Sequence, residues 1–114
     1  MSLDVYLVIK AEVSEDNDAY VYEANITHNL GRMASEAGKL YKALWRPEEL
    51  GAVKAKDIIK HLERGLNLLK SDPEKYKKLN PSNGWGDYEG LVRFTENYLK
   101  ACKDFPEIDI YVSR

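Results

Sequence analysis

The chain has 114 residues, of which 44% are hydrophobic and 32% are charged, a balance typical of one folded domain rather than of a disordered chain. The 17 basic and 19 acidic residues are scattered and give a net charge of −2, so the basic stripe that duplex nucleic acid requires is missing. No apolar run approaches the ~20 residues that cross a bilayer, and the N-terminus lacks the order of a signal peptide. With a lone cysteine, Cys102, we expect no internal disulfide, and we predict a cytoplasmic protein that forms one domain over residues 1–114 and does not bind membranes.

The N-terminal segment has the pattern of a β-hairpin. From residue 3 to residue 12 the apolar residues recur at every second position, which places one side of a strand against a core: Leu3, Val5, Leu7, Ile9 and Ala11. The polar run 14–18 predicts a turn, and residues 19–23 resume a β-prone pattern. We therefore expect two strands joined by a short polar turn.

Three helical patterns follow the hairpin. From Ile26 to Tyr41 the apolar residues fall three or four apart, with Gly38 placed to end or bend that helix. Residues 39–45 are expected to form a further short turn before Arg46 and Pro47. A second amphipathic helix is predicted over about 53–69, followed by a short turn from residue 72 to residue 76. Asp87 is a good N-cap for a third helix, which runs to Cys102.

The C-terminal segment predicts a closing strand, because Ile108, Ile110 and Val112 alternate with polar residues and tyrosine. A two-stranded hairpin alone is marginal in water, so we expect this strand to join the first two in one sheet. The order of elements is then β-β-α-α-α-β. It predicts an α+β fold with a small antiparallel sheet and three helices on one face.

The most unusual local sequence is the junction at residues 25–29, where Asn25, Thr27, His28 and Asn29 surround the expected start of a helix. A helix N-terminus presents unpaired N–H groups and a partial positive charge, so an anion or another polar ligand could bind here. The alternative is structural: asparagine and threonine are ordinary caps, and the histidine could satisfy a neighbouring carbonyl.

A second candidate site is the loop at residues 83–88, in which two glycines free the backbone beside Trp85 and Tyr88. Exposed aromatic rings are favoured binding anchors and can stack on a base or a sugar. The alternative is that Trp85 fills the core beneath a tight loop.

Arg46, in the segment 44–49, could pair with a phosphate or carboxylate through a two-pronged bond, although such a segment is more often a helix stop followed by a helix start. The sequence offers no metal-ligand spacing, because His28 and His61 lie on different predicted helices and no cysteine pair exists. We find no nucleophile elbow, phosphate-binding loop or dinucleotide fingerprint, which favours a binding protein without a cofactor over an enzyme.

The string from Asn25 to Ala34, which reads N-I-T-H-N-L-G-R-M-A, resembles a family of small proteins encoded in bacteriophage genomes and prophage regions. The later strings L-W-R-P-E-E at residues 44–49 and N-G-W-G at residues 83–86 are similar to the same pattern. The resemblance brings no reaction with it. It implies a phage accessory role in the cytosol of a bacterial host, such as counter-defence, inhibition of a host protein or sequestration of a ligand.

Two hypotheses follow from the sequence. The first is a non-catalytic binding protein that receives a small polar or nucleotide-like ligand between the 25–29 junction and the 83–88 loop. In it Asn25, Thr27, His28 and Asn29 form hydrogen bonds, Arg46 supplies positive charge, and Trp85 and Tyr88 stack. The second is a protein-interaction module, either an inhibitor of a host protein or a homodimer that uses an exposed strand edge or its tyrosines.

Overall fold

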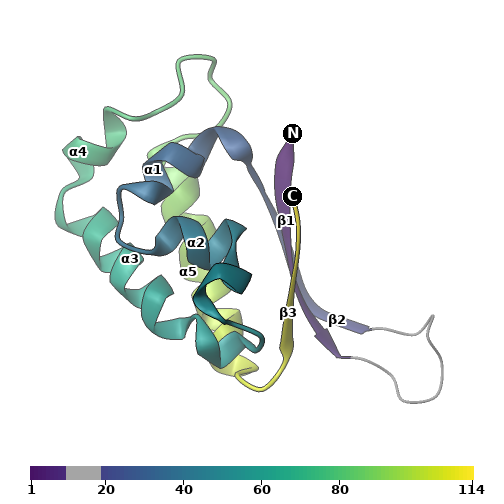
Figure 1. The fold of residues 1–114 in the computed structure, drawn as a ribbon. Coiled ribbons are helices and arrows are strands. Elements are labelled where there is room, and N and C mark those ends of the chain that lie inside the picture. Colours follow the sequence, from purple (N-terminus) through teal and green to yellow (C-terminus); the bar gives the residue numbers. More distant parts are fainter. Residues whose placement is uncertain (10–18) are drawn as a thin grey trace.

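A computed structural model describes residues 1–9 and 19–114, and the predicted turn at residues 14–18 lies outside them. Strands β1 (Ser2–Ile9), β2 (Ala19–Thr27) and β3 (Asp109–Ser113) form an antiparallel sheet in the order β2-β1-β3. The helices lie together on one side of this sheet, as Figure 1 shows. The fold is therefore α+β, and the prediction that the last strand joins the first two is confirmed.

The pairing of β1 with β2 contains a β-bulge. Leu7 lies opposite Tyr22, but the next residue, Val8, lies opposite Tyr20, so Val21 is the extra residue of β2. A bulge changes which side of the sheet the following side chains face. Tyr22 consequently stacks on Tyr98 beneath the sheet, with 5.9 Å between ring centroids, whereas Tyr20 lies against Tyr6 on the other side at 4.9 Å.

The first predicted helix starts too early, whereas the predicted break at Gly38 is confirmed. Strand β2 continues to Thr27, because Ile26 pairs with Leu3 of β1 and turns its side chain into the core as a strand residue. A single 3₁₀ turn, η1 (His28–Leu30), leads into the short helix α1 (Gly31–Ser35), and a separate helix α2 (Leu40–Trp45) follows Gly38. Gly38 has a φ of +64°, the left-handed geometry expected of a glycine that ends a helix.

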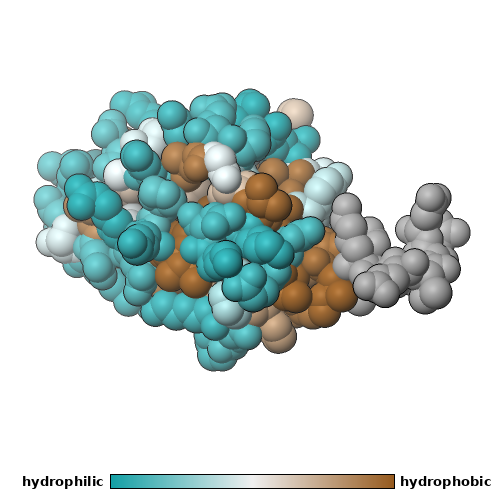
Figure 2. Space-filling model, turned by 60° about the horizontal axis from the view of Figure 1, so that its bottom comes forward, coloured by the Kyte–Doolittle hydropathy of each residue, from teal (hydrophilic) through white to brown (hydrophobic). Residues whose placement is uncertain are grey.

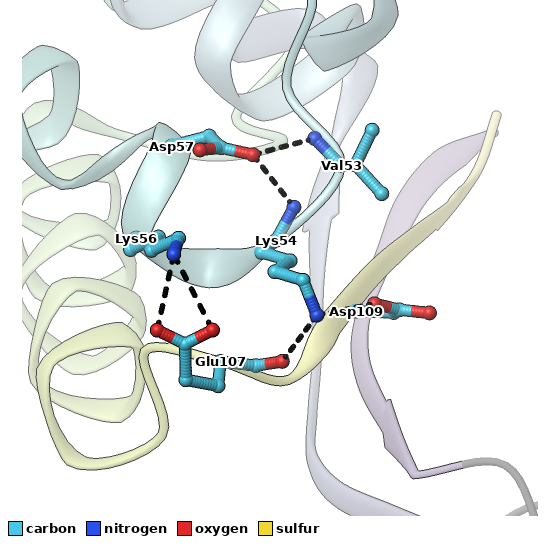
Figure 3. A network of polar contacts seen from close by, with 6 residues as sticks. All are labelled: Val53, Lys54, Lys56, Asp57, Glu107 and Asp109. Atoms are coloured by element: carbon cyan, nitrogen blue, oxygen red, sulfur yellow. Dashed lines mark hydrogen bonds and ion pairs between the residues drawn. The ribbon is translucent and has the colours of Figure 1, made fainter.

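The second predicted helix starts too early. Two 3₁₀ turns, η2 (Pro47–Leu50) and η3 (Ala55–Asp57), precede the helix α3 (Ile59–Ser71). Val53 and Lys54 run along the edge of β3 instead: the Val53 carbonyl accepts the N–H of Ile110 at 2.9 Å, and Lys54 bridges to Asp109. This edge is held by a polar network drawn in Figure 3, in which the Lys56 ammonium reaches the Glu107 carboxylate at 3.1 Å.

The third predicted helix is confirmed. Helix α5 (Tyr88–Asp104) begins after Asp87, whose Oδ1 accepts the N–H of Gly90 at 2.7 Å. A short helix α4 (Pro73–Lys77) precedes the loop that leads to α5. No helix in residues 1–9 and 19–114 is long and apolar enough to cross a membrane.

The core lies between one face of the sheet and the helices. Leu3, Val5 and Leu7 of β1 have no exposed surface. They belong to one buried cluster with residues of α3 and α5 such as Leu62 and Leu91. Burying a leucine side chain stabilises a fold by about 1.5–3 kcal/mol, so this face of β1 anchors the sheet to the helices.

Candidate functional site

A hollow of about 360 Å³ lies where the end of β2 meets the loop between α4 and α5. Its lining includes Asn25 and Thr27 at the end of β2, Asn29 in η1, and Trp85 in the loop. Met1 and Ser2 at the start of β1 complete the wall. The 25–29 junction and the 83–88 loop, which are distant in sequence, therefore face one hollow.

Trp85 is the most exposed aromatic side chain in the described part of the chain, at 69%. It does not fill the core, so the core-filling interpretation of this loop is wrong, and its role as a binding anchor stays a prediction. Gly84 and Gly86 have φ values of +78° and +96°, and the Trp85 N–H donates to Asn83 Oδ1 at 3.0 Å. These contacts fix the backbone on both sides of the indole, so the ring is held out toward the hollow by a defined loop.

Gly86 explains how the loop reaches the junction. A Cβ atom at this position would lie 2.7 Å from Cγ2 of Thr27 and 3.0 Å from the Leu30 side chain. A glycine is therefore required both by the positive φ and by the close approach of the two segments. This contact brings the backbone beside Trp85 against the end of β2.

Asn25 is held in place by its neighbours on β1. Its Nδ2 donates to Oδ1 of Asp4 at 2.6 Å and to Oγ of Ser2 at 2.8 Å. Both bonds use the amide nitrogen, so the side-chain oxygen of Asn25 keeps its capacity to accept. The side chains of this wall are uncharged, and the neighbouring Asp4 carboxylate adds a negative charge.

Thr27 acts as a cap. Its Oγ1 accepts the N–H of Asn29 at 3.3 Å, and η1 extends over only three residues. The expectation of a helix N-terminus that attracts an anion loses its basis, because the turn is too short to align peptide dipoles. Within the described residues the side-chain amide of Asn29 makes no hydrogen bond to another protein group, and it offers one donor end and one acceptor end at the hollow.

The side chain of His28 is held by a structural hydrogen bond. Its Nδ1 accepts the indole N–H of Trp45 at 2.8 Å, and Trp45 is only 3% exposed. The ring of Tyr41 stacks on this indole, with 5.3 Å between the ring centroids. His28 thus serves the packing around α2 and does not line the hollow.

Arg46 and Tyr88 lie away from the hollow. Arg46 forms a weak ion pair with Glu49, with 4.0 Å between Nε and Oε2. Tyr88 is 7% exposed, and its hydroxyl donates to the carbonyl of Leu69 at 2.7 Å near the end of α3. The ring is packed in the core, and burial raises the pKa of its hydroxyl.

Sequence analysis missed Ser2, which lines the hollow, and Asp4, which accepts a hydrogen bond from Asn25. Both lie on β1 opposite the end of β2, where Ser2 pairs with Thr27 and Asp4 pairs with Asn25. Only the strand register brings them there. The alternation of β1 could have shown which side they face, because both occupy even positions that alternate with the buried Leu3 and Val5.

No group of three or more histidine, cysteine or acidic side chains in residues 1–9 and 19–114 is placed to hold a metal ion. Cys102 is buried on the inward side of α5, and burial raises its pKa to about 12, which keeps it a thiol at neutral pH. The lining of the hollow combines hydrogen-bonding side chains with one exposed indole ring.

Comparison of the chain with protein-family models, curated proteins and solved structures gives no significant match. The interpretation of the hollow rests on its geometry.

Proposed function

We propose that the protein binds a small, uncharged polar ligand with a planar ring, of the nucleobase or nucleoside kind, in the hollow between the 25–29 junction and Trp85. The observation that carries the proposal is the exposed indole of Trp85 beside a wall of neutral hydrogen-bonding groups. A base stacked on an aromatic side chain gains about 1–3 kcal/mol, and the amides and hydroxyls beside it can satisfy the polar edge of the ring.

The charges around the hollow favour a ligand that is recognised by its ring over one that is recognised by a phosphate group. None of the lysines and arginines in residues 1–9 and 19–114 lines the hollow, Arg46 lies elsewhere, and the carboxylate beside Asn25 belongs to Asp4. A phosphate needs cationic or well-aligned N–H donors, and a nearby carboxylate repels it. A nucleoside therefore fits this hollow better than a nucleotide.

The test is a titration of the protein with adenosine, guanosine, cytidine and uridine, each compared with its monophosphate, followed by calorimetry and by tryptophan fluorescence. We expect at least one nucleoside to bind and to change the fluorescence of Trp85, and the monophosphate to bind more weakly. Trp85→Ala should weaken binding about tenfold because stacking is lost. Asn29→Ala should weaken it about fivefold through one lost hydrogen bond.

Two substitutions serve as controls. Phe105→Ala removes another exposed aromatic ring, at 40% exposure, that does not line the hollow, and should leave binding unchanged. Arg46→Ala should also have no effect, because the guanidinium lies outside the site. If no nucleoside binds at millimolar concentration, or if the monophosphate binds more tightly in a manner that depends on Arg46, the proposal is wrong.

A further inference from the structure

The second face of the sheet, called here the open face, is covered by none of the described helices (Figure 1). The strand register assigns its side chains: Ser2, Asp4, Tyr6, Val8, Tyr20, Glu23, Asn25, Thr27, Asp109, Tyr111 and Ser113. The charged members of this set are all acidic. No lysine or arginine of the three described strands lies on it.

Three tyrosines form the centre of the open face. The ring of Tyr6 lies between those of Tyr20 and Tyr111, with centroids 4.9 and 5.6 Å away. Tyr20 and Tyr111 are each 56% exposed. The bulge at Val21 is what turns Tyr20 toward this cluster, so a local irregularity of β2 completes an exposed aromatic surface.

A hollow of about 430 Å³ adjoins the tyrosines. Its apolar wall includes Val8 and Val53, and Asp109 and Tyr111 stand beside it. Figure 2 shows hydrophobic surface gathered toward the side of the molecule where the sheet lies. An apolar wall next to a carboxylate suits an arginine or lysine side chain, whose stem is apolar and whose end is charged.

The acidic groups around the tyrosines are poorly neutralised. Among the described residues, Asp4 and Glu23 form no ion pair, and Asp109 meets the Lys54 ammonium only at 3.8 Å. Burial raises the pKa of Tyr6, and the nearby charges of Asp4 and Glu23 raise it further, so the phenol stays neutral. The tyrosines thus present neutral ring faces within a negative field, the arrangement that attracts cations.

We infer that the open face docks a basic segment of a partner protein, with arginine or lysine side chains placed over Tyr6, Tyr20 and Tyr111 and in the adjoining hollow. Charge decides between this occupant and a second copy of the chain. Two open faces brought together would set carboxylates against carboxylates with no cation from the strands between them, which is unfavourable. The tyrosine cluster and its adjoining hollow share no lining residue with the hollow at Trp85, although Ser2, Asn25 and Thr27 at the other end of the open face line the latter.

The test uses short fluorescent peptides of equal length, one rich in arginine and one rich in glutamate, and measures binding to the full chain by anisotropy at two salt concentrations. We expect the arginine peptide to bind and the glutamate peptide not to bind. Tyr111→Leu keeps an apolar side chain but loses the ring face, and should weaken binding about threefold to fivefold. The double variant Tyr20→Leu and Tyr111→Leu should weaken it about tenfold.

A matched pair of charge substitutions distinguishes binding at the open face from general electrostatic attraction of the peptide to the protein. Glu23→Gln on the open face should weaken binding about threefold, whereas Glu74→Gln on α4, which makes the same change in net charge, should not. Equal effects of the two would overturn the inference. So would a dimer in light scattering that Tyr111→Leu dissociates, because the occupant would then be a second copy. Trp85→Ala should leave peptide binding unchanged. The outcome of the peptide test is therefore independent of whether the protein binds a nucleoside at Trp85.

Discussion

The two faces of strand β1 differ in what covers them. Leu3, Val5 and Leu7 are fully buried beneath the helices, whereas Asp4 and Tyr6 point to the face that no described helix covers. Packing requires apolar side chains on the first face. On the second face packing does not explain three neighbouring tyrosines among carboxylates, or an exposed tryptophan at one end. Both proposed binding surfaces lie on this uncovered side.

This difference between the two faces predicts that neighbouring positions of β1 contribute very unequally to the free energy of unfolding. Leu7→Ala should lower the free energy of unfolding by about 3 kcal/mol, through lost burial and the cavity left behind. Tyr6→Ala should lower it by only about 1 kcal/mol, the value of its aromatic contacts on a partly exposed surface. Urea unfolding followed by circular dichroism measures both. Equal losses would mean that the open face is covered in solution.

The loop that carries Trp85 allows a sharper test with two glycines. Gly86→Ala should lower the free energy of unfolding by about 2 kcal/mol, because the new Cβ meets Thr27 at 2.7 Å and the φ of +96° is strained for alanine. Gly84→Ala meets nothing within 4 Å and should lose only about 1 kcal/mol from its φ of +78°. The same urea titrations measure both variants. If the two losses are equal, the close contact between the loop and the junction does not matter.

Two buried tyrosines of α5 should respond with opposite signs when the hydroxyl is removed. The hydroxyl of Tyr98 is buried and meets no hydrogen-bond partner among the described residues, so Tyr98→Phe should raise the free energy of unfolding by about 1 kcal/mol. The hydroxyl of Tyr88 donates to Leu69 at 2.7 Å, so Tyr88→Phe should lower it by about 1 kcal/mol. Thermal unfolding of the two variants beside the unmodified protein decides the signs. Two changes of the same sign would contradict this account.

The sequence was sufficient for the class of fold and for the long elements. The alternation at residues 3–9 and the cap at Asp87 are strong local signals, and β1 and α5 appear where they were expected. The region after residue 25 was misassigned because Ile26 faces inward under both a helical and a strand period, and only its pairing with Leu3 decides between them. The extended segment at Val53 and Lys54 could not be predicted from local sequence either, because its partner β3 lies at the other end of the chain.

For the candidate site, the sequence could indicate which residue types can bind a ligand but not which way their side chains point. Asn25, Thr27, Asn29 and Trp85 meet at one hollow. Tyr88 is close to Trp85 in sequence, yet the first turn of α5 points its ring into the core. The tyrosine cluster could not be foreseen, because strict alternation would put Tyr20 and Tyr22 on the same face and the bulge separates them.

The smallest expected effect concerns the turn that holds the edge of the sheet beside the open face. Asp57 accepts the N–H groups of Val53 and Lys54 at 3.0 and 2.9 Å (Figure 3), and these two bonds hold the pKa of its carboxyl below its ordinary range. A pKa that is lower in the folded state contributes stability above the unfolded value of about 3.9, and that contribution is lost as the pH falls through the folded pKa. Asp57→Asn should therefore lower the melting temperature at neutral pH.

Melting temperatures measured from neutral pH down to about pH 2 test this sign. The unmodified protein and Asp57→Asn should converge as the carboxyl of Asp57 is protonated. Asp104→Asn, which removes a carboxylate at the far end of α5, is the control for general loss of negative charge. A gap that stays constant to the lowest pH would show that the asparagine acts through altered geometry and not through lost charge. The turn at residues 53–57 would then support the edge of β3 without any electrostatic contribution from Asp57.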